Sequence, residues 1–171
     1  MIEPPADVTP LIDLLAERGT GPTRTRRPVY EDLLPPCNQA CPAGENIQGW
    51  LEQVRSGRYR EAWLTLTRDN PFPAIHGRVC YHPCETRCNR GALDSSVSIH
   101  AVERFLGDLA TQEGWQLPVE APASGKRVLV VGAGPSGLSA AYHLARLGHA
   151  VEIRDAGSQP GGMLHFGIPA Y

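Results

Sequence analysis

Apolar side chains recur at helical spacing through the first two thirds of the chain. One set lies at i, i+3, i+4 and i+7, on one helix face: Ile47, Trp50, Leu51 and Val54. The pattern repeats over residues 59–66 and ends at Asn70-Pro71, which stops a helix. A third stretch, residues 96–109, turns five side chains inward: Ile99, Val102, Phe105, Leu106 and Leu109. The spacing predicts a helical domain over residues 36–115, preceded by a capped helix at Thr9 and a linker within residues 1–35.

The pattern changes after a second linker, residues 116–125. RVLVV is a continuous β-branched run, as in a strand buried on both faces, and the helical pattern LSAAYHLARL and the strand AVEIRD follow it. The predicted fold class is therefore α + α/β, with the first βαβ unit of a Rossmann-type domain over residues 126–171. Because a doubly wound sheet has about five or six strands, we expect the chain to be part of something longer.

The turn after the first strand has the GxGxxG spacing of a dinucleotide-binding loop. It comprises Gly132, Ala133, Gly134, Pro135, Ser136 and Gly137. Gly132 allows the tight turn, Gly134 lets the backbone approach a pyrophosphate, and Gly137 lets the helix pack closely on the strand. The N-terminus of the helix then faces the phosphates. Asp155, which ends the second strand, is expected to accept hydrogen bonds from the ribose hydroxyls.

Gly161 and Gly162 indicate FAD rather than NAD(P) as the ligand of this turn. The pair can bring a second stretch of backbone close to the cofactor. An acidic residue followed shortly by such a pair resembles the flavoproteins with two dinucleotide sites. In those proteins the first Rossmann unit takes FAD and a later one takes NAD(P)H. His165 fits two interpretations, a contact to the flavin or a packed surface histidine.

Composition and net charge limit the kinds of partner that we expect for this protein. Hydrophobic residues make up 42% and charged residues 20%, and the net charge of −2 favours neither nucleic acid nor an anionic membrane. We see no signal peptide and no apolar run near the ~20 residues that span a bilayer, so we expect a cytoplasmic protein. The five cysteines fall in two clusters, CNQAC and CYHPCETRC. In a reducing compartment, such clusters favour metal or redox chemistry over disulfides.

Several motifs in one order closely resemble the small (β) subunit of glutamate synthase. They are CNQACPAGENIQGWL, NPFPAIHGRVCYHPCETRCNRG, VSIHAVERFLGD and the glycine-rich segment that ends in GGMLHFGIPAY. The N-terminal part of dihydropyrimidine dehydrogenase is similar. The resemblance covers residues 36–171 and implies [4Fe–4S] clusters in the helical domain, ahead of an FAD domain interrupted by an NAD(P)H domain. Electrons would pass between NAD(P)H, FAD and the clusters, and then to a catalytic large subunit or another redox partner.

The resemblance also implies the ligands of one cluster, one of them not a cysteine: Cys41, Cys80, Cys84 and Glu103. Cys37 and Cys88 match a second cluster, but two cysteines that the family carries upstream of Cys37 are absent here. The gap between the first two cysteines of the second motif is also shorter than in glutamate synthase. Because two cubane clusters need eight ligands, we expect one cluster, with Glu103 or Cys88 as its fourth ligand.

Alternatives remain open at this point. The cysteines could hold zinc with help from His76 and His82, and Glu103 could be a rim carboxylate in a salt bridge. The protein could serve a 2-oxoacid or other ferredoxin-dependent oxidoreductase, or be a non-enzymatic module in which a metal organises a docking surface. The residues nominate no catalytic side chain. They leave open NADH against NADPH, the electron acceptor and the oligomeric state.

Overall fold

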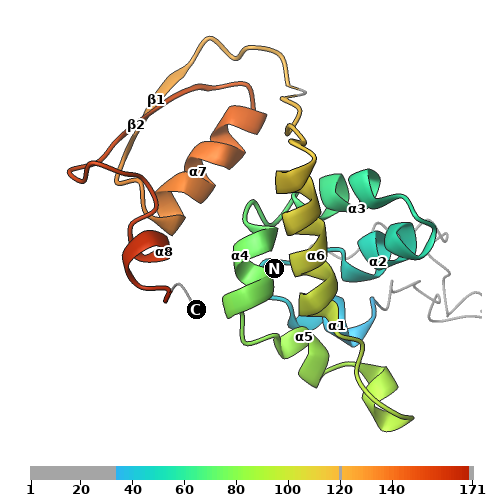
Figure 1. Ribbon diagram of the computed structural model, residues 1–171. Helices are drawn as coiled ribbons and strands as arrows, with labels where there is room; N and C mark the ends of the chain where they lie inside the picture. Colours follow the sequence, from blue (N-terminus) through green and yellow to red (C-terminus); the bar gives the residue numbers. More distant parts are fainter. Residues whose placement is uncertain (1–33, 120, 170–171) are drawn as a thin grey trace, which may run out of the picture. The chain divides into compact units, whose positions relative to one another are not determined.

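The computed structural model describes residues 34–119 and 121–169. The predicted helix at Thr9 lies outside the described residues. Two helices, α2 (Ile47–Arg55) and α3 (Tyr59–Leu66), form the expected hairpin (Figure 1). Asn46 caps α2 by accepting a hydrogen bond from the N–H of Gly49 at 3.1 Å.

The longest helix of this part, α6 (Ile99–Gln112), packs against α3 and most extensively against α4 (Pro73–Val79). It begins and ends three residues later than the sequence predicted, because Ser98 is its N-cap residue. The core is formed by large side chains of α2, α3 and α6: Ile47, Trp50, Leu66, Ile99 and Leu106. Phe105, predicted to point inward, is 46% exposed and packs edge-on against Tyr59 at 5.4 Å between ring centroids.

Helices α4 and α6 approach very closely because a glycine stands at the contact on each side. A Cβ atom on Gly77 would lie 2.5 Å from the backbone N of Arg104, and one on Gly107 would lie 2.2 Å from the backbone N of Ala74. Arg78 of α4 also pairs with Asp108 of α6 through two hydrogen bonds of 2.8 and 2.9 Å. The three short elements α1 (Pro36–Ala40), α5 (Pro83–Thr86) and η1 (Asn89–Ala92) complete the helical part.

The glycine-rich part has the predicted βαβ order. Strands β1 (Arg127–Val131) and β2 (Ala150–Arg154) pair in parallel, and α7 (Pro135–Arg146) connects them. A short helix, α8 (Met163–Phe166), follows. The prediction that β1 is buried on both faces is wrong for the described residues. Leu129 and Val131 are 54% and 83% exposed, because α7 covers only one face of the two strands.

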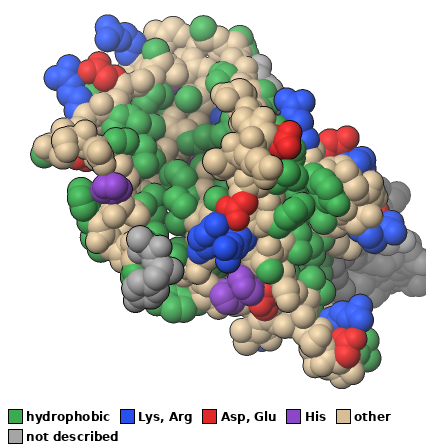
Figure 2. Space-filling model, viewed as in Figure 1, with side chains coloured by type: hydrophobic (Ala, Val, Ile, Leu, Met, Phe, Trp, Pro, Cys, Tyr) green, Lys and Arg blue, Asp and Glu red, His purple; other side chains and the backbone are tan. Residues whose placement is uncertain are grey.

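Charged side chains on the surface occur in small groups of mixed sign. On the face shown in Figure 2, Lys and Arg side chains lie beside Asp and Glu side chains. Arg55–Glu52 and Arg90–Asp94 are two ion pairs on the surface of the described part of the chain. Within residues 34–119 and 121–169, no helix is both long enough and apolar enough to cross a membrane.

Candidate functional site

Three of the five cysteines line one cavity of about 300 Å³ in the helical part, which we call the cysteine cavity. Cys41 directly follows α1, Cys80 directly follows α4, and Cys84 lies in α5. Glu103 reaches the same cavity from α6, and apolar side chains, among them Ile99, form part of the wall. Four segments of the chain therefore bring together the ligand set that the family resemblance implied.

Local sequence explains why these thiols meet. Prolines at the first turn start α1, α4 and α5, because a proline costs no hydrogen bond there. Cys41 and Cys80 then leave their helices in extended conformation, with φ/ψ of −73°/119° and −66°/143°. His82 adopts the left-handed conformation, at φ 42°, and so turns the chain sharply between Cys80 and Cys84. The short spacing in CYHPC is thus compatible with both sulfurs facing one cavity.

The thiols of the cysteine cavity are poorly hydrated. Cys84 is 8% exposed, and its burial raises the pKa of the thiol to about 12. A hydrogen bond from the backbone of Glu85 has a smaller, lowering effect, and Cys41, Cys80 and the Glu85 carboxylate add small raising effects. Burial also raises the pKa of Cys41. All five cysteines are free. Such thiols ionise when a metal replaces the proton, so the cavity suits a metal site that releases protons on loading.

Glu103 is 7% exposed, and no salt bridge to it is found among the described residues. Its Oε1 atom instead accepts a hydrogen bond of 2.7 Å from the amide of Asn70. The same amide donates to Oε1 of Glu45 at 2.9 Å. Burial, reinforced by the neighbouring Glu45 carboxylate, raises the pKa of Glu103 to about 8. Glu103 is therefore not a rim carboxylate in a salt bridge, and its role as a metal ligand stays a prediction.

Cys37 and Cys88 do not line the cysteine cavity. Cys37 lies in α1, which packs against α5, and Cys88 follows α5 in the chain. Burial raises the pKa of Cys37, and the neighbouring Cys88 adds a small effect in the same direction. The pKa of Cys88 is lowered, mainly by a hydrogen bond from the backbone of Val97. The structure thus sorts the cysteines into a set of three and a set of two.

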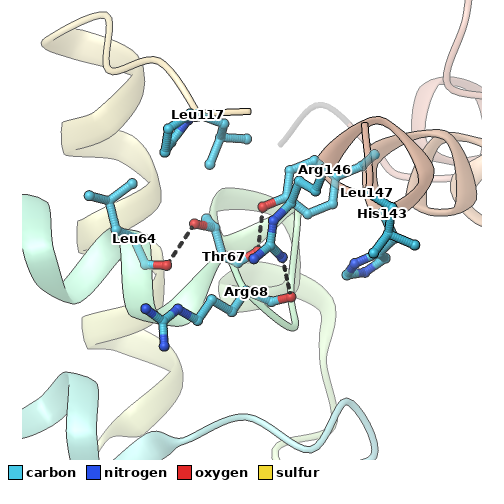
Figure 3. Close-up of a pocket in the computed structure, with 9 residues that line it drawn as sticks. Leu64, Thr67, Arg68, Leu117, His143, Arg146 and Leu147 are labelled. Atoms are coloured by element: carbon cyan, nitrogen blue, oxygen red, sulfur yellow. Dashed lines mark hydrogen bonds between the residues drawn. The ribbon is translucent and has the colours of Figure 1, made fainter. Parts of the chain in front are cut away.

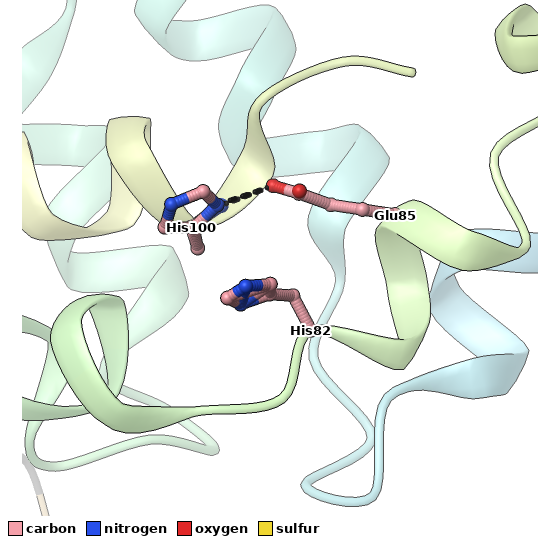
Figure 4. Close-up of side chains that lie close together, drawn as sticks. All are labelled: His82, Glu85 and His100. Atoms are coloured by element: carbon pink, nitrogen blue, oxygen red, sulfur yellow. Dashed lines mark hydrogen bonds and ion pairs between the residues drawn. The ribbon is translucent and has the colours of Figure 1, made fainter.

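A histidine pair that no sequence pattern indicated lines the same cavity. His82 and His100 stack with 4.1 Å between ring centroids and 14° between planes, and Nδ1 of His100 lies 2.7 Å from Glu85 (Figure 4). The hydrogen bonds from His100 outweigh the effect of burial and hold the pKa of Glu85 below its usual value. One nitrogen each of His82 and His100 and one carboxylate oxygen of Glu85 lie within 4.8 Å of one another. However, nitrogen lone pairs lie in the ring planes, so two parallel rings do not aim at one ion.

The two histidines proposed for zinc are held by different protein groups. His76 lines the cavity, but its Nδ1 atom lies 2.7 Å from Oδ1 of Asn70. His82 is stacked as described, and its backbone N–H donates to the sulfur of Cys80 at 3.3 Å. Hydrogen bonds from backbone N–H groups to cysteine sulfur tune iron–sulfur sites. The N–H of His82 therefore suits Cys80 as a thiolate ligand of a metal site, whereas the Nε2 atom of His76 stays available to zinc.

The phosphate-binding turn has the geometry that its glycines predict. Gly132 has a φ of 102°, and a Cβ on Gly137 would lie 1.9 Å from the carbonyl oxygen of Gly132. No atom lies within 4 Å of the position of a Cβ on Gly134, so open space faces the backbone there. The N-terminus of α7 begins directly after it. An anion approaching this turn therefore meets free backbone rather than side chains.

The second glycine pair packs on this turn. The N–H of Gly161 donates to the carbonyl oxygen of Ala133 at 2.8 Å, and a Cβ on Gly162 would lie 3.0 Å from the Cα of Gly134. Asp155 lies at the turn as expected, but its oxygens accept from the backbone N–H groups of Ala133 and Gly157 at 2.6 and 2.7 Å. Each oxygen keeps a further lone pair. Contacts from these residues to a cofactor stay predictions.

A further cavity, of about 350 Å³, lies beside the end of α3 and the last turns of α7 (Figure 3). The hydroxyl of Tyr142 donates to the carbonyl oxygen of Thr67 at 2.5 Å, and Arg146 donates to that of Arg68 at 2.7 Å. These bonds satisfy carbonyl groups that the end of a helix leaves free. The cavity contains no convergent set of metal-ligating groups, and we assign it a structural role.

Comparison with known proteins supports both parts. Residues 31–115 match the family model of dihydropyrimidine dehydrogenase domain II, 4Fe–4S cluster, and residues 130–167 match that of an NAD(P)-binding Rossmann-like domain. The glutamate synthase [NADPH] small chain of Mycobacterium tuberculosis is 40% identical, over 92% of this chain and 36% of the relative. The glutamate synthase [NADH] of Schizosaccharomyces pombe is 43% identical, over 75% of this chain and 6% of the relative. The NADP(+)-dependent formate dehydrogenase subunit beta of Moorella thermoacetica is 36% identical, over 80% of this chain and 22% of the relative.

The fold, the site and these matches define a class of protein in which a helical 4Fe–4S domain precedes a dinucleotide-binding Rossmann segment. The predicted fold class is therefore confirmed, as are the kinds of cofactor domain. Within that class, glutamate synthase small chains are homologues of this chain at about 40% identity, as the motifs indicated. It spans between 6 and 36% of the length of the three relatives named above.

Proposed function

We propose that this chain is the electron-transfer part of an NAD(P)H-dependent oxidoreductase, which passes electrons between NAD(P)H, FAD and one [4Fe–4S] cluster. The observation that carries the proposal is the convergence of Cys41, Cys80, Cys84 and Glu103 on one cavity, in the domain ahead of a dinucleotide-binding turn. Three thiols and a carboxylate provide the four ligands that one cubane needs. Cys88 lies outside this cavity, which favours Glu103 as the fourth ligand.

The donor set fits the cluster, and the surrounding residues suit its chemistry. A bound iron–sulfur cluster would accept and release single electrons, at a potential set by ligands, hydrogen bonds and burial. The three cysteines would hold it, and Ile47 and Ile99, each 1% exposed, would exclude water from one side. The N–H of His82 already donates to the sulfur of Cys80 and would stabilise its negative charge. No side chain is assigned a catalytic role, because the cofactors carry the chemistry.

FAD is the proposed ligand of the Gly132–Gly137 turn. Two observations support it: the open space at Gly134, where a pyrophosphate can approach the backbone, and the packing of Gly161 and Gly162 on the same turn. Asp155 would contact the ribose with its remaining lone pairs. NAD(P)H would bind a later dinucleotide site, as in the flavoproteins that this segment resembles.

The electron acceptor would be a partner subunit. The relatives include small chains of glutamate synthase and a β subunit of formate dehydrogenase, each named as part of a larger assembly. The second candidate, a subunit serving a different oxidoreductase, is favoured by the formate dehydrogenase relative and by the absent pair of upstream cysteines. The cytoplasm is the proposed location, because five free clustered thiols suit a reducing compartment.

Cysteine variants test the proposed site. After anaerobic reconstitution with iron and sulfide, Cys84→Ala should lose the visible absorbance of the cluster, because Cys84 lines the cavity. Cys37→Ala is the matched control and should keep it, because Cys37 lies outside the cavity. Full absorbance in Cys84→Ala, or loss in Cys37→Ala alone, would show that the cluster is bound elsewhere.

A further inference from the structure

Asn70 is buried at 1% exposure, and its short side chain meets four polar groups. Its amide nitrogen donates to the Oε1 atoms of Glu45 and Glu103, at 2.9 and 2.7 Å. Its Oδ1 atom accepts from the backbone N–H of Phe72 at 3.0 Å and lies 2.7 Å from Nδ1 of His76. The chain segment that joins α3 to α4 therefore reaches into the wall of the cysteine cavity.

The orientation of this amide follows from its neighbours. The backbone N–H of Phe72 is only a donor, so the atom facing it must be the amide oxygen of Asn70. The NH₂ group then points the other way, and its two hydrogens match the two carboxylates. Aspartate at this position would keep the acceptor for Phe72 but lose both donors. The site thus requires an amide.

The amide holds one oxygen of Glu103 and leaves the other available. Oε1 is bonded to Asn70, whereas no hydrogen bond within the described part of the chain reaches Oε2. Glu103 lines the cysteine cavity together with the three thiols. A carboxylate anchored through one oxygen can bind iron through the second without losing conformational freedom at that moment. Groups that orient a ligand in this way typically change metal affinity by roughly 10- to 100-fold when removed.

We propose that Asn70 is the positioning residue for Glu103, and that it presents the free oxygen of Glu103 to one iron of the cluster. The inference rests on the proposed function, since it needs a cluster in the cysteine cavity. Asn70 itself is not a ligand, because both of its polar ends are engaged with protein groups. It acts on a single iron, the one without a cysteine ligand.

The test is to replace Asn70 with aspartate in the complete chain and to follow that iron. Asn70→Asp should lose one iron to a chelator roughly tenfold to a hundredfold faster than the wild type. After mild oxidation, its spectrum in electron paramagnetic resonance should show a three-iron cluster. The matched control is Asn38→Asp, the same change at a residue that is also buried but bonds Asn46 and Gln48 outside the cavity. It should retain about four irons, as a cubane has.

Three further variants complete the test: Glu103→Ala, Asn70→Asp/Glu103→Ala and Asn70→Ser. The double variant Asn70→Asp/Glu103→Ala should lose iron no faster than Glu103→Ala, because a positioning residue acts only through its target. Asn70→Ser, whose hydroxyl is too short to reach Glu103, should behave like Asn70→Asp and replaces it if that variant fails to fold. Retention of four irons in both Asn70 variants, additive losses in the double variant, or no effect of Glu103→Ala would each overturn the inference. Absence of iron and sulfide from the wild type would instead refute the proposed function.

Discussion

Gly107→Ala offers a sharp test of how α4 and α6 are held together. A Cβ atom at this position would lie 2.2, 2.6 and 2.8 Å from the N, Cα and Cβ atoms of Ala74. Favourable contacts between such atoms are about 3.5–4.0 Å long, so the helices must separate by roughly 1 Å. The obstacle is mainly backbone, which cannot rotate out of the way.

The magnitude follows from two opposing effects. Alanine in a helix is more favourable than glycine by about 1 kcal/mol. Overpacking costs about 1–3 kcal/mol, and the upper end applies where backbone must move. The net loss in the free energy of unfolding should therefore be about 2 kcal/mol. For a domain of this size, that corresponds to a decrease of about 10 °C in the melting temperature.

The assay is thermal unfolding of the cluster-free protein, followed by circular dichroism. Gly91→Ala is the control, since its nearest neighbour would be 3.9 Å away, and it should change stability by less than about 0.5 kcal/mol. Because Cys80 follows α4 and Glu103 lies on α6, Gly107→Ala should also weaken iron retention. A variant as stable as the wild type, or more stable, would refute the close packing of these helices.

Two further predictions concern the thiols and the glycine turn. In cluster-free protein at mildly alkaline pH, iodoacetamide should modify Cys88 first and Cys84 last, because a thiol with a lowered pKa is more often ionised and one with a raised pKa less often. Mass spectrometry of the peptides gives the order of modification. The reverse order would contradict the environments described for these two thiols. Gly134→Val should abolish FAD binding in a flavin fluorescence titration yet keep the melting temperature, because open space surrounds that position. Gly137→Ala should lower both the affinity for FAD and the melting temperature, because its Cβ would lie 1.9 Å from the carbonyl oxygen of Gly132. Flavin bound at wild-type strength by Gly134→Val would exclude this turn as the site.

Features that depend on local periodicity could be predicted from the sequence. The apolar spacing around Trp50 and the glycines at 132, 134 and 137 indicated the helices and the βαβ unit correctly. The exposure of β1 was predicted wrongly, because a β-branched run shows what a strand is suited to and not what covers it. Phe105 was assigned inward by spacing alone, although its partner Tyr59 lies at the edge of the core.

The polar wall of the cysteine cavity left no such signal. In the sequence, Asn70 was recognised only as part of a helix stop. Its side chain nevertheless donates hydrogen bonds to Glu45 and Glu103, which lie 25 and 33 positions away in the chain. Glu85 and His100 are 15 positions apart and also meet only through the fold. The grouping of the cysteines came from a family resemblance and not from their spacing. Contacts between distant residues depend on how the helices pack, which no local pattern encodes.

The most direct test of the account is the metal content of the protein purified without oxygen. Iron, acid-labile sulfide and zinc should be measured per chain on the same sample. One [4Fe–4S] cluster predicts about four iron atoms and four sulfides, with no stoichiometric zinc. A value near eight irons would contradict the single cluster, and one zinc per chain without sulfide would contradict the iron–sulfur site itself.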